Sequence, residues 1–344
     1  MTEVSIILPL HNAESWLEEC LLSIESQNFN GTLELSIFND ASSDQSASIL
    51  ETWLERLRNK KIKVTTSFED GVPKGVGYAK NRAVDQSCGE YLCFLDADDC
   101  MASSRVKKQY EACLSHYNLI VGCCFHREPS DSTPRYTKWA NSLAPGQLYS
   151  QIYTSFGPTL IMPTWFCHRS VYDKVGGFDE KGKGTPEDLL FFYQHLRLGG
   201  KLSRVDDDLL MYRYHPSATT FSISEDTIWQ VRLSELEERV LKKWTTFTIW
   251  NAGKQGRKFY RSLNEQNRQK VQAFCDVDRK KIAKGVYIYE ESKDLPKPRI
   301  PIVHFSKASP PFIICVKIDM TAGVFEQNLS SLHLVEGIDY FHFS

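Results

Sequence analysis

The sequence predicts an α/β protein with two α/β domains, and three observations support this class. Short, continuous apolar runs alternate along the chain with segments whose apolar residues recur at helical spacing. Many of the apolar runs end in glycine-containing or acidic turns. The same alternation starts a second time near residue 246. Strands that alternate with helices indicate right-handed crossovers and parallel sheets.

The composition is that of a globular protein. Of 344 residues, 42% are hydrophobic and 24% are charged, which excludes disordered and fibrous classes. No apolar run approaches the roughly 18 to 20 residues that span a bilayer, and the chain opens on a strand pattern instead of a secretory signal. The ten cysteines are scattered without paired CxxC units, which disfavours zinc and indicates free thiols in a reducing compartment. We therefore expect a cytoplasmic protein with no membrane partner.

The first domain is expected over residues 1–222. Its regular part contains strands at Val4–Leu10, Leu33–Phe38, Ile62–Thr66 and Tyr91–Leu95, with helices between them, the last at Tyr78–Gln86. Beyond Arg105 the pattern predicts strands at Leu119–Phe125, Thr164–His168 and Leu209–Tyr214, and a polar loop over Arg127–Pro145. A helix is predicted between Pro186 and Gly199, because proline suits the first turn of a helix and glycine follows its end.

A connecting helix is expected over 223–245, and a second, smaller α/β domain over 246–344. Strand Phe247–Trp250, a glycine turn, a helix to Leu263 and strand Lys270–Cys275 follow in order, and Asp276 comes next. This order is that of a shortened Rossmann unit, although a strict GxGxxG is missing. We favour a structural role over dinucleotide binding, since lone glycine motifs are weak signals.

Basic residues gather in this second domain. Residues 251–311 hold 14 lysines and arginines against six acidic residues. Such a surface suits a phosphate backbone, although a charge run is often only a solvated helix face. The candidate contacts with RNA are Lys254, Arg257, Lys258, Arg261, Lys280, Lys281 and Lys284.

Three carboxylates follow the buried strand at Tyr91–Leu95: Asp96, Asp98 and Asp99. The carboxyl end of a strand is where open α/β sheets bind their ligands. Hard cations such as Mg²⁺ or Mn²⁺ take oxygen ligands and often bridge the protein to a diphosphate. The alternative is an acidic turn that caps a helix, because DxD alone is a weak pattern.

Four ordered blocks carry a resemblance to the family-two glycosyltransferases: Ser5–Asn12, Ser36–Asp44, Gly75–Val84 and Phe94–Asp99. Two later blocks, Gly176–Phe192 and Tyr212–Pro216, match the acceptor side and the segment that closes the site. The resemblance implies a GT-A fold that binds a nucleotide-sugar, a UDP-sugar donor and Mn²⁺ or Mg²⁺.

The resemblance also implies roles on the donor side. Asp98 would be the metal ligand, Asp96 would bridge metal and ribose, and His215 would complete the metal shell, with a turn histidine before Pro216 as its alternative. Arg213 would pair with the diphosphate through its planar donor fork, or lie solvated at a strand edge. Asp40 would accept a hydrogen bond from the uracil ring, or cap the following helix. Further donor-side candidates are Leu10, Asn12 and Lys80.

On the acceptor side, an inverting transfer needs one base for the acceptor hydroxyl. Asp188 is the expected base and Glu187 the alternative, although Thr185 to Asp188 also reads as a T-x-x-D capping box. Trp165 and Gly177 are expected to contact the acceptor, with a core position as the alternative for Trp165.

The tail residues, including Ile249–Leu263 and Lys297–Phe305, are similar to queuosine-tRNA galactosyltransferases, formerly classed as β-1,3-N-acetylglucosaminyltransferase-like proteins. This likeness implies transfer of galactose from UDP-galactose to queuosine in a tRNA anticodon (of the tRNA-Tyr type), with tRNA as a partner. The alternatives are a UDP-sugar transferase that acts on a glycan or other small acceptor, and a nucleotide-sugar binding module without catalysis.

Overall fold

The computed structural model describes residues 2–114, 116–155, 157–216 and 218–344, and it divides into two compact units. The first unit comprises residues 1–145 and 157–227. The second comprises residues 146–156 and 228–344. We expected boundaries at residues 222 and 245, whereas the two compact units divide after residue 227. The short segment 146–156 groups with the second unit.

The first unit is built on an eight-stranded mixed sheet of order β3-β2-β1-β4-β7-β6-β8-β5. Its strands are β1 Val4–Leu10, β2 Leu33–Asp40, β3 Lys63–Glu69, β4 Tyr91–Phe94, β5 Cys100–Met101, β6 Leu119–Glu128, β7 Phe166–His168 and β8 Lys201–Arg213. Strands β3, β2, β1 and β4 are parallel, as the apolar runs predict, and every residue of β1 is buried. Buried runs of this kind need helices on both faces of the sheet.

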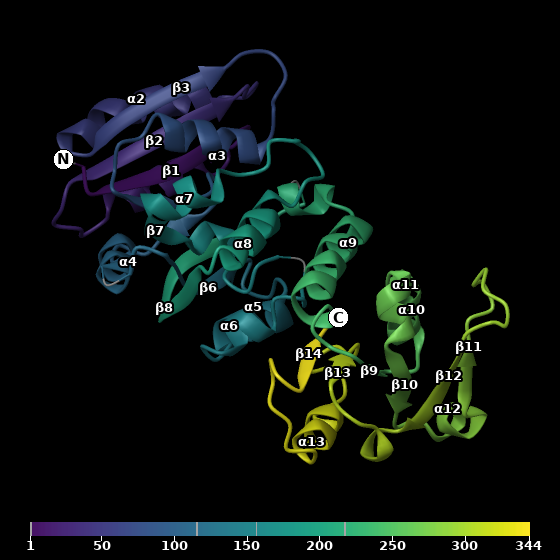
Figure 1. Ribbon diagram of the computed structural model, residues 1–344. Coiled ribbons are helices and arrows are strands. Elements are labelled where there is room, and N and C mark those ends of the chain that lie inside the picture. The colour runs from purple at the N-terminus through teal and green to yellow at the C-terminus, as the bar shows by residue number, and fades with distance from the viewer. Residues whose placement is uncertain (1, 115, 156, 217) are drawn as a thin grey trace. The chain divides into compact units, whose positions relative to one another are not determined.

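The helices of the first unit follow the strands in alternation. They are α1 Leu17–Glu25, α2 Ser46–Asn59, α3 Val76–Asp85, α4 Arg105–Cys113, α5 Pro134–Ser142, α7 Arg169–Val175 and α8 Glu187–Arg197, with short turns η1 Met162–Thr164 and η2 Thr219–Ser222. Figure 1 shows α2 and α3 lying along β1, β2 and β3. The carboxyl ends of β1, β2 and β4 therefore meet at one edge of the sheet, where the site is built.

Two expectations for the irregular half are wrong. The loop expected over Arg127–Pro145 contains the end of β6 and helix α5, because Pro134 occupies the first turn, where a proline needs no amide hydrogen. Strand β8 begins at Lys201, well before the expected Leu209. Its acidic stretch Asp206–Asp208 hides the strand from a hydrophobic pattern, yet β6 pairs alongside it with a register shift near Cys124.

The second unit has a six-stranded sheet of order β11-β12-β10-β9-β13-β14. The strands are β9 Phe247–Trp250, β10 Val271–Asp276, β11 Val286–Ile288, β12 Arg299–His304, β13 Phe312–Ile314 and β14 Tyr340–His342. Only β11 is antiparallel to its neighbour among these described strands. The helices are α6 Gln147–Ser150, α9 Glu225–Leu236, a π-helical turn Glu237–Leu241, α10 Lys254–Ser262, α11 Glu265–Gln269, α12 Arg279–Lys284, η4 Phe305–Lys307 and α13 Val324–Ser330.

The predicted Rossmann-like unit is present as β9–α10–β10, and its glycine turn is closed by the protein's own side chains. The amide of Ala252 donates to Asp276 Oδ2 at 2.9 Å, and that of Gly253 donates to Asn251 Oδ1 at 2.7 Å. A Cβ at Gly256 would lie 1.8 Å from the Asn251 carbonyl oxygen, so glycine is required for the close packing of helix on strand. The turn is thus held by contacts within the second unit.

Candidate active site

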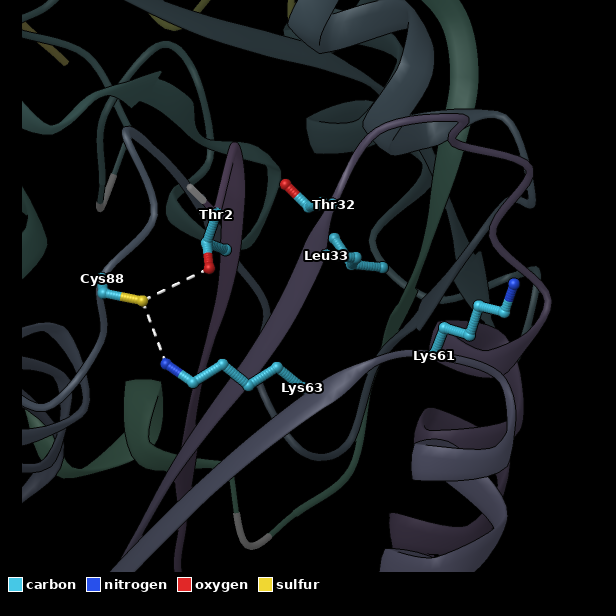
Figure 2. A pocket seen from close by; sticks show the side chains of 6 residues that line it. All are labelled: Thr2, Thr32, Leu33, Lys61, Lys63 and Cys88. Carbon is cyan, nitrogen blue, oxygen red and sulfur yellow. Dashed lines mark hydrogen bonds between the residues drawn. The ribbon is translucent and has the colours of Figure 1, made fainter.

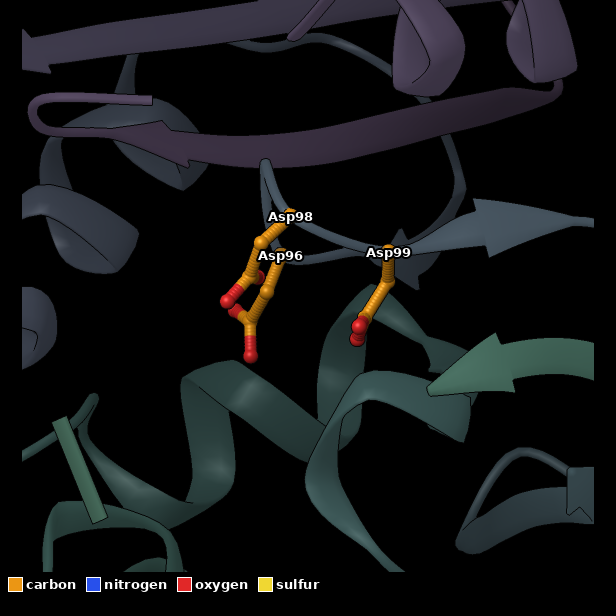
Figure 3. A group of neighbouring side chains, drawn as sticks. All are labelled: Asp96, Asp98 and Asp99. Atoms are coloured by element: carbon orange, nitrogen blue, oxygen red, sulfur yellow. The ribbon is translucent and has the colours of Figure 1, made fainter. Parts of the chain in front are cut away.

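The carboxylates that follow β4 converge on one small volume. Ligand oxygens of Asp96, Asp98 and Asp99 all lie within 4.8 Å of one another. Figure 3 shows Asp96 and Asp98 pointing the same way from the loop, with Asp99 beside them. The turn that gathers them is closed by the amide of Asp99, which donates to the carbonyl of Asp96 at 3.1 Å. Strand β4 pairs with β1 through Ile7 and Phe94, which holds the cluster at the carboxyl edge of the sheet.

The cluster suits a hard divalent cation. Asp96 Oδ1 and Asp99 Oδ2 are buried and have no hydrogen-bond partner among the described residues. Burial raises the pKa of Asp96 to about 6. The positive charge of Lys80 opposes this rise, and the negative charge of Asp98 adds to it. Burial and both neighbouring carboxylates raise the pKa of Asp99 well above its ordinary value. Crowded, underpaired carboxylate oxygens are stabilised by a cation that takes oxygen ligands. The donor set therefore fits Mg²⁺ or Mn²⁺.

Residues at the end of β8 return to the aspartate loop. His215 Nε2 lies 2.8 Å from Asp98 Oδ2, and its ring lies 4.1 Å from that of Trp16. Arg213 donates from its amide to Asp99 Oδ1 at 2.9 Å and from Nε to the carbonyl of Asp98 at 2.8 Å. Its terminal nitrogen pairs with Glu19. Arg213 is therefore not a solvated strand-edge residue, and the contact with Asp98 holds the His215 ring beside the aspartate cluster.

Asp188 stands in the first turn of α8, and the alternative capping role is wrong. The helix begins at Glu187 with Pro186 as its N-cap, and no side chain caps it. In a T-x-x-D capping box, Thr185 would be the N-cap and Asp188 the third residue of the helix. Here Pro186 is the N-cap and Asp188 is the second residue. Its Oδ1 accepts only the adjacent amide of Leu189, at 2.7 Å, among the bonds described. Burial, followed by the charge of Glu187, raises the pKa of Asp188 to about 7, a value that suits a general base near neutral pH.

Glu187 forms a buried ion pair with Lys80. Lys80 Nζ donates to Glu187 Oε1 at 2.9 Å, and their side chains are 3% and 8% exposed. Burial alone would lower the pKa of Lys80, but the charges of Glu187, Asp96 and Asp188 together outweigh burial and raise that pKa to about 12. A carboxylate held by a permanent cation is a poor proton acceptor, so Glu187 is disfavoured as the base. Lys80 is committed to Glu187 in this structure, whereas a donor-side role would need it to face the diphosphate.

Asp40 holds the glycine loop ahead of α3. Its two carboxylate oxygens accept the amides of Lys74 at 2.9 Å and Gly75 at 2.7 Å. Helix α2 begins at Ser46, beyond its reach, and Asp44 bonds the Ser46 amide instead. The helix-cap alternative for Asp40 is therefore wrong. Its carbonyl oxygen also contacts His11 Nδ1, which ties the ends of β1 and β2 together.

The remaining donor-side candidates differ in exposure. Asn12 is exposed, adopts a φ of 47°, and its Oδ1 accepts the amide of Ser43 at 2.8 Å. It therefore joins the loops after β1 and β2 at the rim. Leu10 is fully buried, so its side chain belongs to the core and only its backbone lies at the rim.

The structure corrects the expectation for Trp165. Its indole is 1% exposed and donates from Nε1 to the carbonyl of Leu160 at 2.7 Å. It packs against Phe191 and Phe192 of α8, which leaves no face for an acceptor. Gly177 has a φ of 88°, and a Cβ there would lie 3.1 Å from Asn81 Oδ1. The tight turn alone explains that glycine.

Three residues of the site were missing from the predicted set. Asp99 was part of the acidic run but had no assigned role, and its adjacency to Asp98 was the available signal. Trp16, the N-cap of α1, and Glu19 in its first turn lie more than 190 residues before their partners His215 and Arg213. No local sequence pattern connects them, because only the fold brings α1 to the end of β8.

Comparison with known proteins agrees with this geometry. The family model described as glycosyl transferase family 2 matches residues 5–176, half of the chain. The chain belongs to glycosyltransferase family 2. Its fold is the GT-A fold. Among the described residues, no helix is long and apolar enough to cross a membrane.

Individual relatives share the first unit most clearly. The uncharacterized glycosyltransferase EpsJ of Bacillus subtilis is 25% identical over 222 residues, which are 63% of this chain and 62% of that protein. The GalNAc(5)-diNAcBac-PP-undecaprenol β-1,3-glucosyltransferase of Campylobacter jejuni is 30% identical over 124 residues, 36% of this chain and 38% of that protein. The matched segment thus spans less than two thirds of either relative.

A solved structure supports the fold assignment. The crystal structure of S. aureus TarS 1–349 in complex with UDP superposes with a TM-score of 0.53 at 20% identity, and covers 69% of this chain and 66% of that chain. At this identity the likeness shows the shared fold.

Proposed function

We propose that the chain is an inverting, metal-assisted glycosyltransferase that moves a hexose from a UDP-sugar to an acceptor hydroxyl. One observation carries the proposal. The aspartate cluster at the sheet edge, which has carboxylate oxygens without hydrogen-bond partners among the described residues, lies close enough to Asp188 to act on its pKa, which is raised to about 7. The charge of Asp96 is among the causes of that raised pKa. Donor and acceptor chemistry would thus share one site.

The chain's own residues account for the steps around the reacting carbon. Asp96, Asp98, Asp99 and His215 would hold a Mn²⁺ or Mg²⁺ ion, which supplies a positive charge to the diphosphate leaving group. The carboxylate of Asp188 removes the proton of the acceptor hydroxyl as its oxygen bonds to the anomeric carbon. The bond from that carbon to the UDP oxygen breaks in the same displacement, which inverts the configuration. Lys80 keeps Glu187 and the first turn of α8 in place beside the base.

Hydrolysis of UDP-sugars by the purified chain tests the reaction class. With Mn²⁺ present, slow release of UDP without acceptor is expected, and chelation of the metal should abolish it. An Asp98→Ala variant should fail to release UDP. The control is Asp207→Ala, which removes an exposed carboxylate of β8 and should behave as the wild type. Binding of UDP-sugar with no turnover under any condition would instead support a binding module.

A glycan hydroxyl is the acceptor that the named relatives support. The C. jejuni relative is described as a β-1,3-glucosyltransferase acting on a lipid-linked saccharide. S. aureus TarS, 32% identical over 122 residues, is described as a poly(ribitol-phosphate) β-N-acetylglucosaminyltransferase. Those 122 residues are 35% of this chain and 20% of TarS. These descriptions support a UDP-sugar donor such as UDP-GlcNAc and an acceptor hydroxyl on a glycan or polyol-phosphate polymer.

A second acceptor, queuosine in a tRNA, is supported by the tail resemblance and by basic helices of the second unit. Helices α10 and α12 contain no acidic residue, and α12 buries none of its side chains. Of the basic candidates, Lys254, Lys280 and Lys284 are exposed. The others are engaged: Arg257 and Arg261 contact Tyr287, Lys258 lies over Trp229, and Lys281 pairs with Asp276. UDP-galactose would then be the donor.

A donor and acceptor screen separates the two acceptors. Purified protein is incubated with UDP-galactose or UDP-GlcNAc and with queuosine-bearing tRNA, unmodified tRNA or saccharides, and the products are read by mass spectrometry. Galactose on queuosine alone would establish the tRNA acceptor. Sugar on a saccharide with unchanged tRNA nucleosides would establish the glycan acceptor.

A further inference from the structure

A solvent-open pocket lies at the amino end of the first sheet. Its volume is about 390 Å³, and it is lined by Thr2, Thr32, Leu33, Lys61, Lys63 and Cys88 (Figure 2). Leu33 and Lys63 open strands β2 and β3, and Cys88 precedes β4. The aspartate cluster follows the carboxyl end of β4, so this pocket belongs to the opposite edge of the sheet. No step of the proposed transfer uses its residues.

Glu34 anchors the two reactive groups of this pocket. Its side chain is fully buried, Oε1 accepts Lys63 Nζ at 2.7 Å, and Oε2 accepts the amide of Cys88 at 2.7 Å. Although burial alone would raise it, the hydrogen bonds from Cys88, Lys63 and Ser5 lower the pKa of Glu34 to about 2. This carboxylate is therefore charged at all physiological pH values. It fixes the ammonium of Lys63 and the backbone of Cys88 relative to each other.

Cys88 differs from the other cysteines in both exposure and neighbours. All ten cysteines are described by the structure, and Cys88 alone is exposed. Lys63 Nζ donates to Cys88 Sγ at 3.0 Å, and Sγ contacts Thr2 Oγ1 at 3.3 Å, as the dashed lines in Figure 2 show. The bond to Cys88, followed by that to Glu34, raises the pKa of Lys63. Cys100 is the most accessible of the other nine cysteines, and burial raises the pKa of its thiol to about 11.

We propose that Cys88 and Lys63 form a modification site at which a hydroperoxide oxidises the Cys88 thiolate. Lys63 Nζ lies 3.0 Å from Sγ, where its positive charge faces the position of a thiolate, the nucleophilic form of cysteine. The thiolate sulfur attacks one peroxide oxygen, the O–O bond breaks, and the leaving hydroxide takes a proton from Lys63. With hydrogen peroxide the products are a sulfenic acid on Cys88, one water and a neutral Lys63 amine, so charge and atoms balance. The two-electron oxidant is the peroxide.

The test is sulfenic-acid trapping on the folded, full-length chain. Protein is treated with dilute hydrogen peroxide and a cyclic 1,3-dione, and the labelled fraction of each cysteine is followed by peptide mass spectrometry. Cys88 is expected to label first. Lys63→Gln should slow its labelling by up to about fivefold, the ratio that an exposed ion pair supports, and Lys63→Arg should restore the rate. Cys88→Ser should leave UDP-sugar turnover at the wild-type level.

Two results would overturn the proposal. One is labelling of Cys100 or any buried cysteine as fast as Cys88. The other is an unchanged Cys88 rate in a Lys63→Gln variant whose thermal transition matches the wild type, because the ammonium would then have no influence on the thiol. Buried cysteines label only if the chain opens, so their protection in each variant reports that it is folded.

Discussion

Replacement of Asp188 by asparagine separates the chemistry from the fold. If Asp188 is the base, the variant keeps the shape of the side chain but loses the proton acceptor. We expect turnover to fall by about 10² or more, the size typical of general-base loss, while affinity for UDP is retained. The wild-type kcat/KM should rise with pH and level off above about pH 7, where Asp188 loses its proton. The kcat/KM of the Asp188→Asn variant should not show this rise with pH.

The same substitution should stabilise the protein. Burial and Glu187 hold the pKa of Asp188 at about 7, against an ordinary value of 3.8. The folded state therefore binds a proton that the unfolded state releases, and stability falls as pH rises from about 4 to 7. Each unit of pKa is worth about 1.4 kcal/mol. Partial exposure of the side chain reduces the gain, so we expect about 2 kcal/mol at pH 8 and none at pH 4.

Thermal melts at both pH values and single-turnover kinetics measure the two effects. For a unit of this size, about 2 kcal/mol corresponds to a rise in Tm of roughly 4 to 8 °C. Glu187→Gln is the matched neighbour, and it should destabilise the fold because it leaves Lys80 buried without its counter-ion. A fall in both Tm and UDP affinity for Asp188→Asn would refute the reasoning and indicate a structural role.

Three further outcomes are expected. Asp98→Ala should abolish both transfer and metal-dependent UDP binding by calorimetry, and full turnover in this variant would remove Asp98 from the site. Glu187→Gln should move the acidic limb of kcat/KM to lower pH, because the charge that raises the pKa of Asp188 is lost while Lys80 remains; an unmoved limb would show that Glu187 does not act on the base. If the acceptor is tRNA, glutamate at Lys254, Lys280 and Lys284 should weaken tRNA binding and reduce its salt dependence by up to three phosphate contacts, with UDP-sugar hydrolysis unchanged. The control variant carries glutamate at the exposed lysines 60, 61 and 107. If both variants bound tRNA equally well, the surface formed by Lys254, Lys280 and Lys284 would not be the tRNA-binding surface.

The sequence predicted the parallel half of the first sheet and the β9–α10–β10 unit because both follow simple rules. Buried strands appear as continuous apolar runs, and their carboxyl ends share one edge, so the acidic run after β4 could be assigned to a ligand site. The family blocks added Asp188 and His215. The irregular half was less accessible, since β8 carries three consecutive aspartates and α5 lies in a proline-bearing polar segment.

Tertiary structure decided which of the alternative roles each residue could fill. The pairing of Glu187 with Lys80, from helices more than a hundred residues apart in sequence, leaves Asp188 as the carboxylate free to take a proton. The burial of Trp165 removed it from the acceptor surface. Local sequence determines helices and strands because backbone and side-chain preferences act over a few residues. Charge state and exposure depend on neighbours that only the folded chain brings together, so the ion pair of Glu187 with Lys80 and the raised pKa of Asp188 could be found only from the structure.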